Sequence, residues 1–152
     1  MSWVTIVETS PILSIPLLNL LNEANYRPMK ELSPLFRRTI TLVKNIPEGS
    51  VTSYGRIADL IAAPGCGRHV SYILSSSSKK YGLPWHRVIS SSGKLPSHAS
   101  ARRQRRLLEQ EDIEIDGTSI DMDQYLWKPT KTEVNKLLKG IPKHKSIYLR
   151  KN

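Results

Sequence analysis

The segment PWHRV, residues 84–88, combines side chains of very different chemistry. His86 can act as an acid, a base or a metal ligand near neutral pH, and Arg87 can bind a carboxylate or a phosphate. Trp85 stands beside them, yet its indole can only pack, stack or donate one N–H. Because Pro84 restricts the backbone before this aromatic residue, we expect the segment to present Trp85 rigidly.

The single cysteine could take part in two other kinds of chemistry. Cys66 and His69 have a C-x-x-H spacing that could hold a metal, but a structural zinc ion needs four ligands and the chain has no second cysteine. Cys66 also has no orienting base beside it that would activate the thiol as a nucleophile. We therefore expect an ordinary loop thiol, no bound metal, no cofactor and no internal disulfide.

The charge of the chain points to a polyanionic partner. Its 152 residues include 23 Lys+Arg against 13 Asp+Glu, a formal net charge of +10. Nucleic acid or an anionic membrane surface would attract such a chain. The apolar run at residues 12–21 is broken by Pro16 and is shorter than the roughly 20 residues that span a bilayer, so we expect no membrane anchor.

The length and the uneven charge suggest one globular domain with two extensions. We expect an N-terminal extension over residues 1–30, the domain over 31–129 and a basic tail over 130–152. The tail has a net charge of +6 and includes Gly140 and Pro142. It is predicted to be largely mobile and to hold anionic partners loosely.

Hydrophobic spacing and turn residues predict the elements that position the chemical groups. We expect helices over about residues 33–46, 53–63, 67–78 and 100–111. Short extended pieces are expected at 51–52, 88–89 and 113–115. The second and third helices, joined by a short Pro/Gly turn, follow the helix-turn-helix plan.

Several side chains on these helices allow two interpretations. The cluster Arg102, Arg103, Arg105 and Arg106 is either a solvated helix face or a phosphate-binding surface. Arg68 begins the second helix of the helix-turn-helix, where it either reaches a DNA groove or faces solvent. Tyr54 is either a half-buried aromatic or, beside an arginine, a device that pushes a base out of its stack.

The order GSVTSYGRIA, GRHVSYIL, LPWHRVISSSGKL, RRLLEQEDIEI and YLWKP resembles the O6-alkylguanine-DNA alkyltransferase family over about residues 33–129. In the enzymes of that family the loop reads Pro-Cys-His-Arg, and its cysteine accepts the alkyl group from guanine O6. Here Trp85 takes the place of the cysteine. That replacement defines the alkyltransferase-like proteins, which bind O6-alkylguanine and hand it to nucleotide excision repair.

The resemblance implies a fold and a set of site residues. The fold would be α/β (α+β), a small winged-helix-like helix-turn-helix domain with a minor β element. Tyr54 matches the tyrosine that rotates the target phosphate, Arg68 matches the arginine finger that replaces the flipped base, and His86 and Glu111 match the former activating pair. The lesion pocket is then expected to comprise Tyr54, Pro84, Trp85, His86, Arg87, Val88, Ser91 and Glu111. The DNA-binding residues are expected to be Tyr54, Arg68, Ser71, His98, Arg102 and Arg103.

The sequence departs from the family pattern in two places. The recognition helix of the family has small residues after the arginine finger, whereas Ser71 and Tyr72 follow here, and Tyr72 either crowds the DNA backbone or faces away. The loop after Gly93 is short, and it offers His98 where a lesion-sensing arginine would be expected. Residues 1–30 and 130–152 are not covered by the resemblance.

The function predicted from this reasoning is recognition without catalysis. A monomer would bind double-stranded DNA containing O6-alkylguanine by nucleotide flipping, without alkyl transfer, and flag the lesion for nucleotide excision repair proteins. It would act in the nucleus of a eukaryote or the cytoplasm of a prokaryote. Two alternatives remain open: a helix-turn-helix transcription factor, and a residual alkyltransferase or DNA hydrolase that uses His86 and Glu111 with water.

Overall fold

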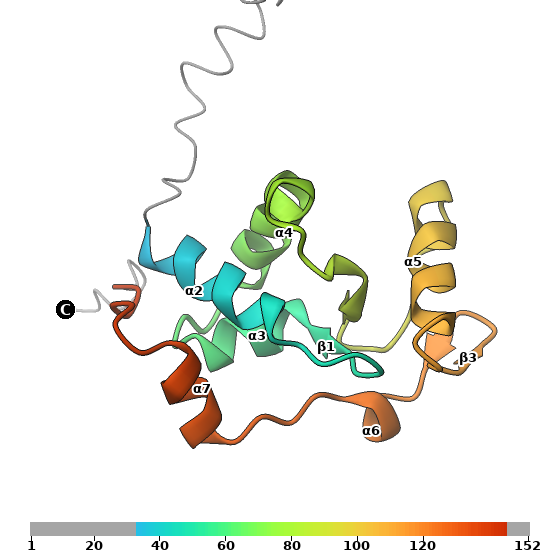
Figure 1. The fold of residues 1–152 in the computed structure, drawn as a ribbon. Helices are drawn as coiled ribbons and strands as arrows, with labels where there is room; N and C mark the ends of the chain where they lie inside the picture. Colours follow the sequence, from blue (N-terminus) through green and yellow to red (C-terminus); the bar gives the residue numbers. More distant parts are fainter. Residues whose placement is uncertain (1–32, 146–152) are drawn as a thin grey trace, which may run out of the picture. The chain divides into compact units, whose positions relative to one another are not determined.

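The computed structural model describes residues 33–145. The chain divides after Glu31, and the N-terminal extension expected over 1–30 lies outside the described residues. Figure 1 shows the described elements in the order α2 (Pro34–Lys44), β1 (Thr52–Ser53), α3 (Tyr54–Leu60), α4 (Gly67–Tyr81), the 3₁₀ helix η2 (Trp85–Arg87), β2 (Val88–Ile89), α5 (Ala99–Glu109), β3 (Ile115–Asp116), β4 (Ser119–Ile120), α6 (Met122–Tyr125) and α7 (Lys131–Leu137). The expected mixed α+β architecture with a minor β element is confirmed.

Local capping signals begin the first two described helices where the sequence predicts. The Ser33 hydroxyl accepts a hydrogen bond from the Phe36 amide at 3.1 Å, and Pro34 occupies the first turn of α2. The Ser53 hydroxyl accepts one from the Arg56 amide at 3.2 Å and so caps α3. These caps set the direction in which α2 and α3 enter the core.

Helix α4 continues past its expected end. The serine cluster lies inside the helix, where the hydroxyls of Ser76 and Ser78 donate to backbone carbonyls of the preceding turn. The helix stops at Gly82, which adopts a left-handed conformation with a φ of 59°. At the other end of α4, a Cβ on Gly67 would lie 3.4 Å from the Gly55 backbone, so these two glycines permit close packing of α3 and α4.

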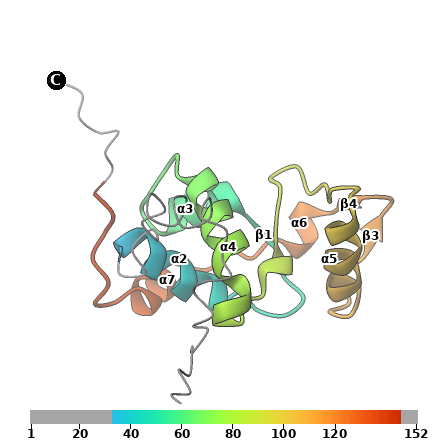
Figure 2. The same ribbon diagram turned by 90° about the horizontal axis from the view of Figure 1, so that it is seen from above.

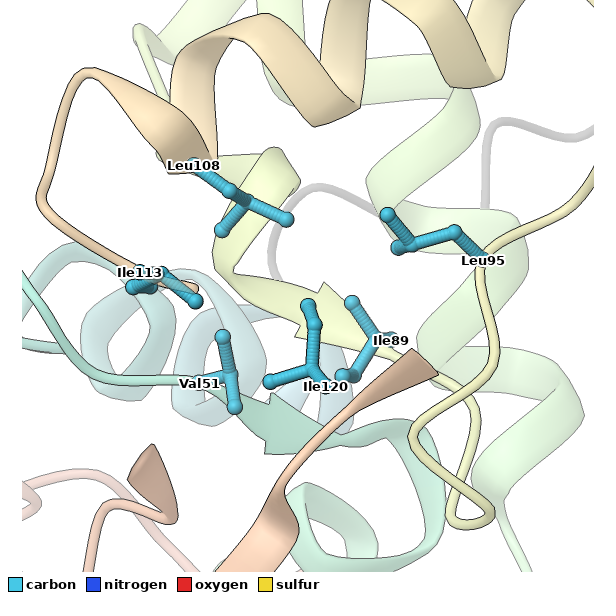
Figure 3. Close-up of a cluster of buried hydrophobic side chains, with 6 residues drawn as sticks. All are labelled: Val51, Ile89, Leu95, Leu108, Ile113 and Ile120. Carbon is cyan, nitrogen blue, oxygen red and sulfur yellow. The ribbon is translucent and has the colours of Figure 1, made fainter. Parts of the chain in front are cut away.

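Two small sheets connect the helices to the second half of the domain. Strand β1 pairs in parallel with β2, with Thr52 opposite Val88, and β3 pairs antiparallel with β4. The strand expected at 113–115 begins only at Ile115, because the amide of Ile113 donates to the carbonyl of Leu108 in α5 at 3.2 Å rather than to a neighbouring strand. Figure 3 shows the core cluster beneath α5, formed by Val51, Ile89, Leu95, Leu108, Ile113 and Ile120.

The prediction of a mobile tail is wrong for residues 130–145. Thr130 and Glu133 form a reciprocal capping box that begins α7, and Val134 and Leu138 are buried. Figures 1 and 2 both show α7 beside α2. Past the end of α7, the carbonyl of Ile141 accepts a hydrogen bond of 2.7 Å from Arg38. Residues 146–152 lie outside the described residues.

Helix length bears on a possible membrane association. None of the helices within residues 33–145 is long and apolar enough to cross a bilayer. The apolar run at 12–21 lies outside the described residues.

Candidate functional site

A cleft of about 710 Å³ opens between α4, α5 and the turn that joins α4 to η2. Its volume is within the range of sites that enclose a small molecule, roughly 300–1,000 Å³. Four of the expected site residues, Tyr54, Ser71, Trp85 and Arg103, contribute to its lining. The full set of lining residues is Tyr54, Ser71, Leu74, Ser75, Ser78, Lys79, Gly82, Leu83, Trp85 and Arg103.

Two aromatic side chains give the cleft flat apolar surfaces. Trp85 is half-buried at the start of η2, and its ring meets that of His86 edge to face, with centroids 6.3 Å apart. Tyr54, the first residue of α3, is also half-buried, and burial raises the pKa of its hydroxyl. The phenol therefore stays protonated near neutral pH and can donate a hydrogen bond to a group in the cleft.

The Glu111 carboxylate fixes the segment that carries Trp85. His86 Nε2 lies 2.6 Å from Glu111 Oε1, and the Arg87 guanidinium donates to both carboxylate oxygens at 2.8–3.0 Å. A further bond runs from the Gly49 amide to Oε2 at 3.2 Å. None of these four residues is among those that line the cleft in the described part of the chain. They position the cleft wall from behind.

These contacts also set the ionisation of Glu111. Burial acts to raise the pKa of its carboxyl group, but the hydrogen bonds from Arg87, His86 and Gly49 and the charge of His86 outweigh that effect. The net result is a pKa below the ordinary value, so Glu111 is a carboxylate at neutral pH. A negative Glu111 suits the ion pair with Arg87 and makes this side chain an acceptor at its contact with His86.

Gln104 is a positioning residue that the sequence reasoning missed. Its side-chain amide is buried in α5 and donates to the carbonyls of His86 and Val88, both at 3.2 Å. Gln104 thus ties η2 and β2 to α5 across the back of the cleft. A signal was present, since Gln104 lies in the helical stripe with Ala101 and Leu108, where an apolar residue would be usual.

The outer face of α4 carries the residues expected to meet DNA. Arg68 is exposed on the first turn, and Ser71 is exposed one turn later. Tyr72 is 39% exposed, so it projects from the helix surface rather than into the core. A ligand that approaches α4 from outside would therefore meet Arg68 and Tyr72 together with the cleft.

The arginine cluster of α5 has a divided role. Arg102, Arg103 and Arg106 are exposed. Arg105 instead pairs with Glu109 at 2.9 Å and donates to the carbonyl of Gly117 at 2.6 Å, which holds the β3–β4 hairpin against the helix. Arg105 therefore has a structural role that neither interpretation included, and the choice between a solvated face and a phosphate-binding surface concerns the three exposed arginines.

The remaining expected residues do not gather at the cleft. Pro84 caps η2, Val88 is fully buried in β2, Ser91 is exposed in the turn after β2, and His98 is exposed at the N-cap of α5. Cys66 is buried at the N-cap of α4, away from the lining residues. No group of three or more His, Cys, Asp or Glu side chains within residues 33–145 could hold a metal ion.

Comparison with known proteins relates this arrangement to DNA-repair domains. The family model described as 6-O-methylguanine DNA methyltransferase, DNA binding domain, matches residues 34–113. Alkyltransferase-like protein 1 of Schizosaccharomyces pombe is 33% identical over 102 residues, which are 62% of this chain and 94% of that protein. The DNA base-flipping protein of Escherichia coli is 36% identical over 93 residues, which are 60% of this chain and 72% of that protein.

A solved structure agrees with the sequence relatives. The crystal structure of S. pombe Atl1 in complex with damaged DNA containing O6-carboxymethylguanine is similar to this chain with a TM-score of 0.58 and 32% sequence identity. The similarity covers 62% of this chain and 95% of that one. Sequence and fold thus agree, and the chain belongs to the O6-alkylguanine-DNA alkyltransferase family, in its alkyltransferase-like branch.

Proposed function

We propose that this protein binds O6-alkylguanine in duplex DNA by turning the damaged nucleotide out of the stack and into the cleft between α4 and α5, without removing the alkyl group. The proposal is supported by relatives named for base flipping and by the S. pombe complex with damaged DNA. Extrusion of a base costs a few kcal/mol of stacking and pairing, least for a damaged base. The cleft receives the base, and its walls supply new contacts.

The observation that carries the proposal is the position of Trp85 on the cleft wall. Its indole stands where the resemblance places the acceptor cysteine of the enzymes, and an indole cannot attack an alkyl carbon as a thiolate can. Cys66 does not replace the missing thiol, since it is buried at the start of α4 outside the cleft. The site therefore offers stacking to the flipped base in place of transfer.

Side chains of α3 and α4 would turn the damaged base out of the duplex. The guanidinium of Arg68, which is exposed on α4, would enter the space that the flipped base leaves, and Tyr54, which lines the cleft, would guide the nucleotide into it. Ser71 lines the cleft between them. Arg102 and His98 would hold the DNA backbone on the α5 side, whereas Arg103, expected in the same group, lines the cleft. Contacts of this kind position the duplex and do not read its sequence.

The former catalytic pair would serve the loop rather than a reaction. His86 and Glu111 are within hydrogen-bond distance, but neither lines the cleft, and Arg87 also occupies the same carboxylate. Activation of a water molecule on a bound base would require one of them to face the cleft. Pro84, Val88 and Ser91 likewise contribute to the shape of the loop and its turn.

A bound lesion must be passed on if it is not repaired in place. Insertion of a helix and an arginine into the minor groove bends the duplex, and a bend is a feature that other proteins can detect. We propose that the protein acts as a monomer and that nucleotide excision repair proteins recognise the bent complex. It would do so in the nucleus of a eukaryote or the cytoplasm of a prokaryote.

The test compares matched duplexes with and without one O6-methylguanine, by fluorescence anisotropy, followed by intact-mass measurement of the protein. We expect tighter binding to the damaged duplex and an unchanged protein mass. A methyl adduct in stoichiometric amount would show an active transferase. Equal affinity for both duplexes, with a preference for one undamaged sequence, would instead show a transcription factor.

A further inference from the structure

Two cationic side chains line the proposed lesion cleft on different walls. Lys79 comes from the last turns of α4 and Arg103 from the second turn of α5. Both are exposed, and neither makes a hydrogen bond or an ion pair within residues 33–145. The family resemblance assigns no role to Lys79, which the sequence reasoning passed over.

The cleft wall offers little to balance these charges. No Asp or Glu is among the described residues that line it. The hydroxyls of Ser75 and Ser78 are engaged, because each donates to a carbonyl of its own helix. The charge that meets a bound group is therefore positive, and it comes from Lys79 and Arg103.

We propose that Lys79 and Arg103 make the cleft selective for O6-alkylguanines whose alkyl group carries a carboxylate. This proposal rests on the proposed function, because it assumes that the flipped base enters the cleft with its O6 substituent. The aromatic surfaces of Tyr54 and Trp85 suit any guanine, so they do not distinguish one substituent from another. A cation on either wall does distinguish them, since it forms an ion pair with a carboxylate and not with a neutral group.

The experiment uses two lesions of nearly equal shape and different charge. Duplexes with O6-carboxymethylguanine, its neutral amide O6-carbamoylmethylguanine, O6-methylguanine or guanine are titrated with the full chain at one salt concentration. The quantity of interest is the ratio of the Kd for the amide to the Kd for the carboxylate. Two partly exposed ion pairs predict a ratio of about 5 for the unmodified protein.

Substitutions assign the ratio to the two cations. Lys79→Gln and Arg103→Gln should each lower the ratio, and the double variant should bring it close to one. Lys80→Gln and Arg106→Gln are the matched controls. Each removes a neighbouring charge on the same helix whose side chain does not line the cleft. These two variants should keep the ratio of the unmodified protein. If they do, the ratio does not arise from general attraction between a positively charged chain and an additional negative charge on the DNA.

Each other outcome identifies what fails. A ratio of one in the unmodified protein, with O6-methylguanine still bound more tightly than guanine, would overturn the selectivity and leave lesion binding intact. A ratio that survives the double substitution would overturn the assignment to Lys79 and Arg103. Loss of affinity for all four duplexes with an unchanged ratio would show that the cations bind phosphates, which also overturns it. If no lesion is bound more tightly than guanine, the proposed function itself fails.

Discussion

Arg87 and Glu111 form a two-point ion pair directly behind the wall that presents Trp85. The guanidinium Nε lies 2.9 Å from Oε2 and its terminal nitrogen lies 2.8 Å from Oε1. The same guanidinium donates to the carbonyl of Ile46 at 2.7 Å. One side chain therefore joins η2 to the end of α5 and to the turn after α2, and the position of Trp85 depends on all three.

Replacement of Glu111 should weaken the fold in a pH-dependent way. Because the pKa of Glu111 is lowered on folding, its contribution is fully present above the ordinary value of 4.5 and is lost as the pH falls through the folded value. We expect Glu111→Gln to cost about 1–3 kcal/mol of unfolding free energy at pH 7. The variant should then lose less than the unmodified protein between pH 7 and pH 3.5 in urea denaturation.

The exposed carboxylate Glu114 provides the control for this measurement. Glu114→Gln removes the same charge from the segment that follows α5, where the side chain is exposed. It should leave both the stability at pH 7 and its acid dependence nearly unchanged. An acid dependence that Glu111→Gln fails to flatten would mean that another group controls it.

Trp85 should determine the preference for damaged DNA rather than overall affinity. Removal of a stacking surface costs about 1–3 kcal/mol per base. We expect Trp85→Ala to lose that amount on an O6-methylguanine duplex and little on its undamaged match, as measured by fluorescence anisotropy. Trp85→Phe keeps a flat face and should retain a larger share of the preference. An equal loss of affinity for both duplexes would show that Trp85 supports the fold and does not recognise the lesion.

Arg68 should be needed for extrusion of the base. If its guanidinium fills the vacated stack, Arg68→Ala should cost about 1–3 kcal/mol on lesion duplexes. The fluorescence rise of a 2-aminopurine at the target position should also be suppressed, because that probe brightens when it leaves the stack. Lys80→Ala on the same helix is the control for loss of charge. A full rise with Arg68→Ala would reject its role as the finger.

Parts of this fold could be predicted because their signals are local. Ser33 and Ser53 cap helices through bonds to amides three residues on, so the start of α2 and α3 could be predicted from a few letters. The end of α4 could not, since the pattern predicts a stop at Ser78 whereas the helix continues through Tyr81 to Gly82. The ring of Tyr81 packs edge to face against Phe36 of α2, a tertiary contact that no local pattern indicates.

The site shows the same division. Trp85 could be identified because an unreactive indole stands beside the reactive side chains of His86 and Arg87. Tyr54 could be identified because it follows Ser53, the expected N-cap of a helix. Lys79 and Gln104 did not, since a lysine near a helix end and a glutamine in a polar helix are both ordinary. Lys79 lines the cleft and Gln104 bonds to η2 and β2, and both positions follow from the tertiary packing of the helices, which no local pattern indicates.

Gly93 should accept no other residue. Its φ is 73°, and a Cβ there would lie 2.4 Å from the carbonyl oxygen of Ile120. Gly93→Ala should therefore lower stability by more than the roughly 1–2 kcal/mol of a left-handed conformation alone. Gly117→Ala isolates that conformational cost, since Gly117 has a φ of 57° and its added Cβ would have no neighbour within 4 Å. Equal thermal shifts for both variants would contradict the steric argument.

The exposed lysines of the C-terminal segment should add affinity without selectivity. In a plot of the logarithm of the DNA-binding constant against the logarithm of the salt concentration, conversion of Lys136, Lys139 and Lys143 to Gln should make the slope less steep. The slope should change by about 0.9 for each phosphate that the chain no longer neutralises. The change should be the same for damaged and undamaged duplexes. Val134→Ala, which disturbs the packing of α7 without altering charge, should lower the unfolding midpoint and leave the slope unchanged. A weakening confined to damaged DNA would place the segment within the lesion site.

The bond from Arg38 to Ile141 joins residues 103 positions apart. In a nascent chain, α2 leaves the ribosome well before that carbonyl has been made, and before Val134 and Leu138 arrive to pack beside it. The part of the core that α7 completes therefore forms last. Until residue 141 has cleared the exit tunnel, α2 can pack against α3 and α4, but the side that α7 covers is a surface that a chaperone can bind.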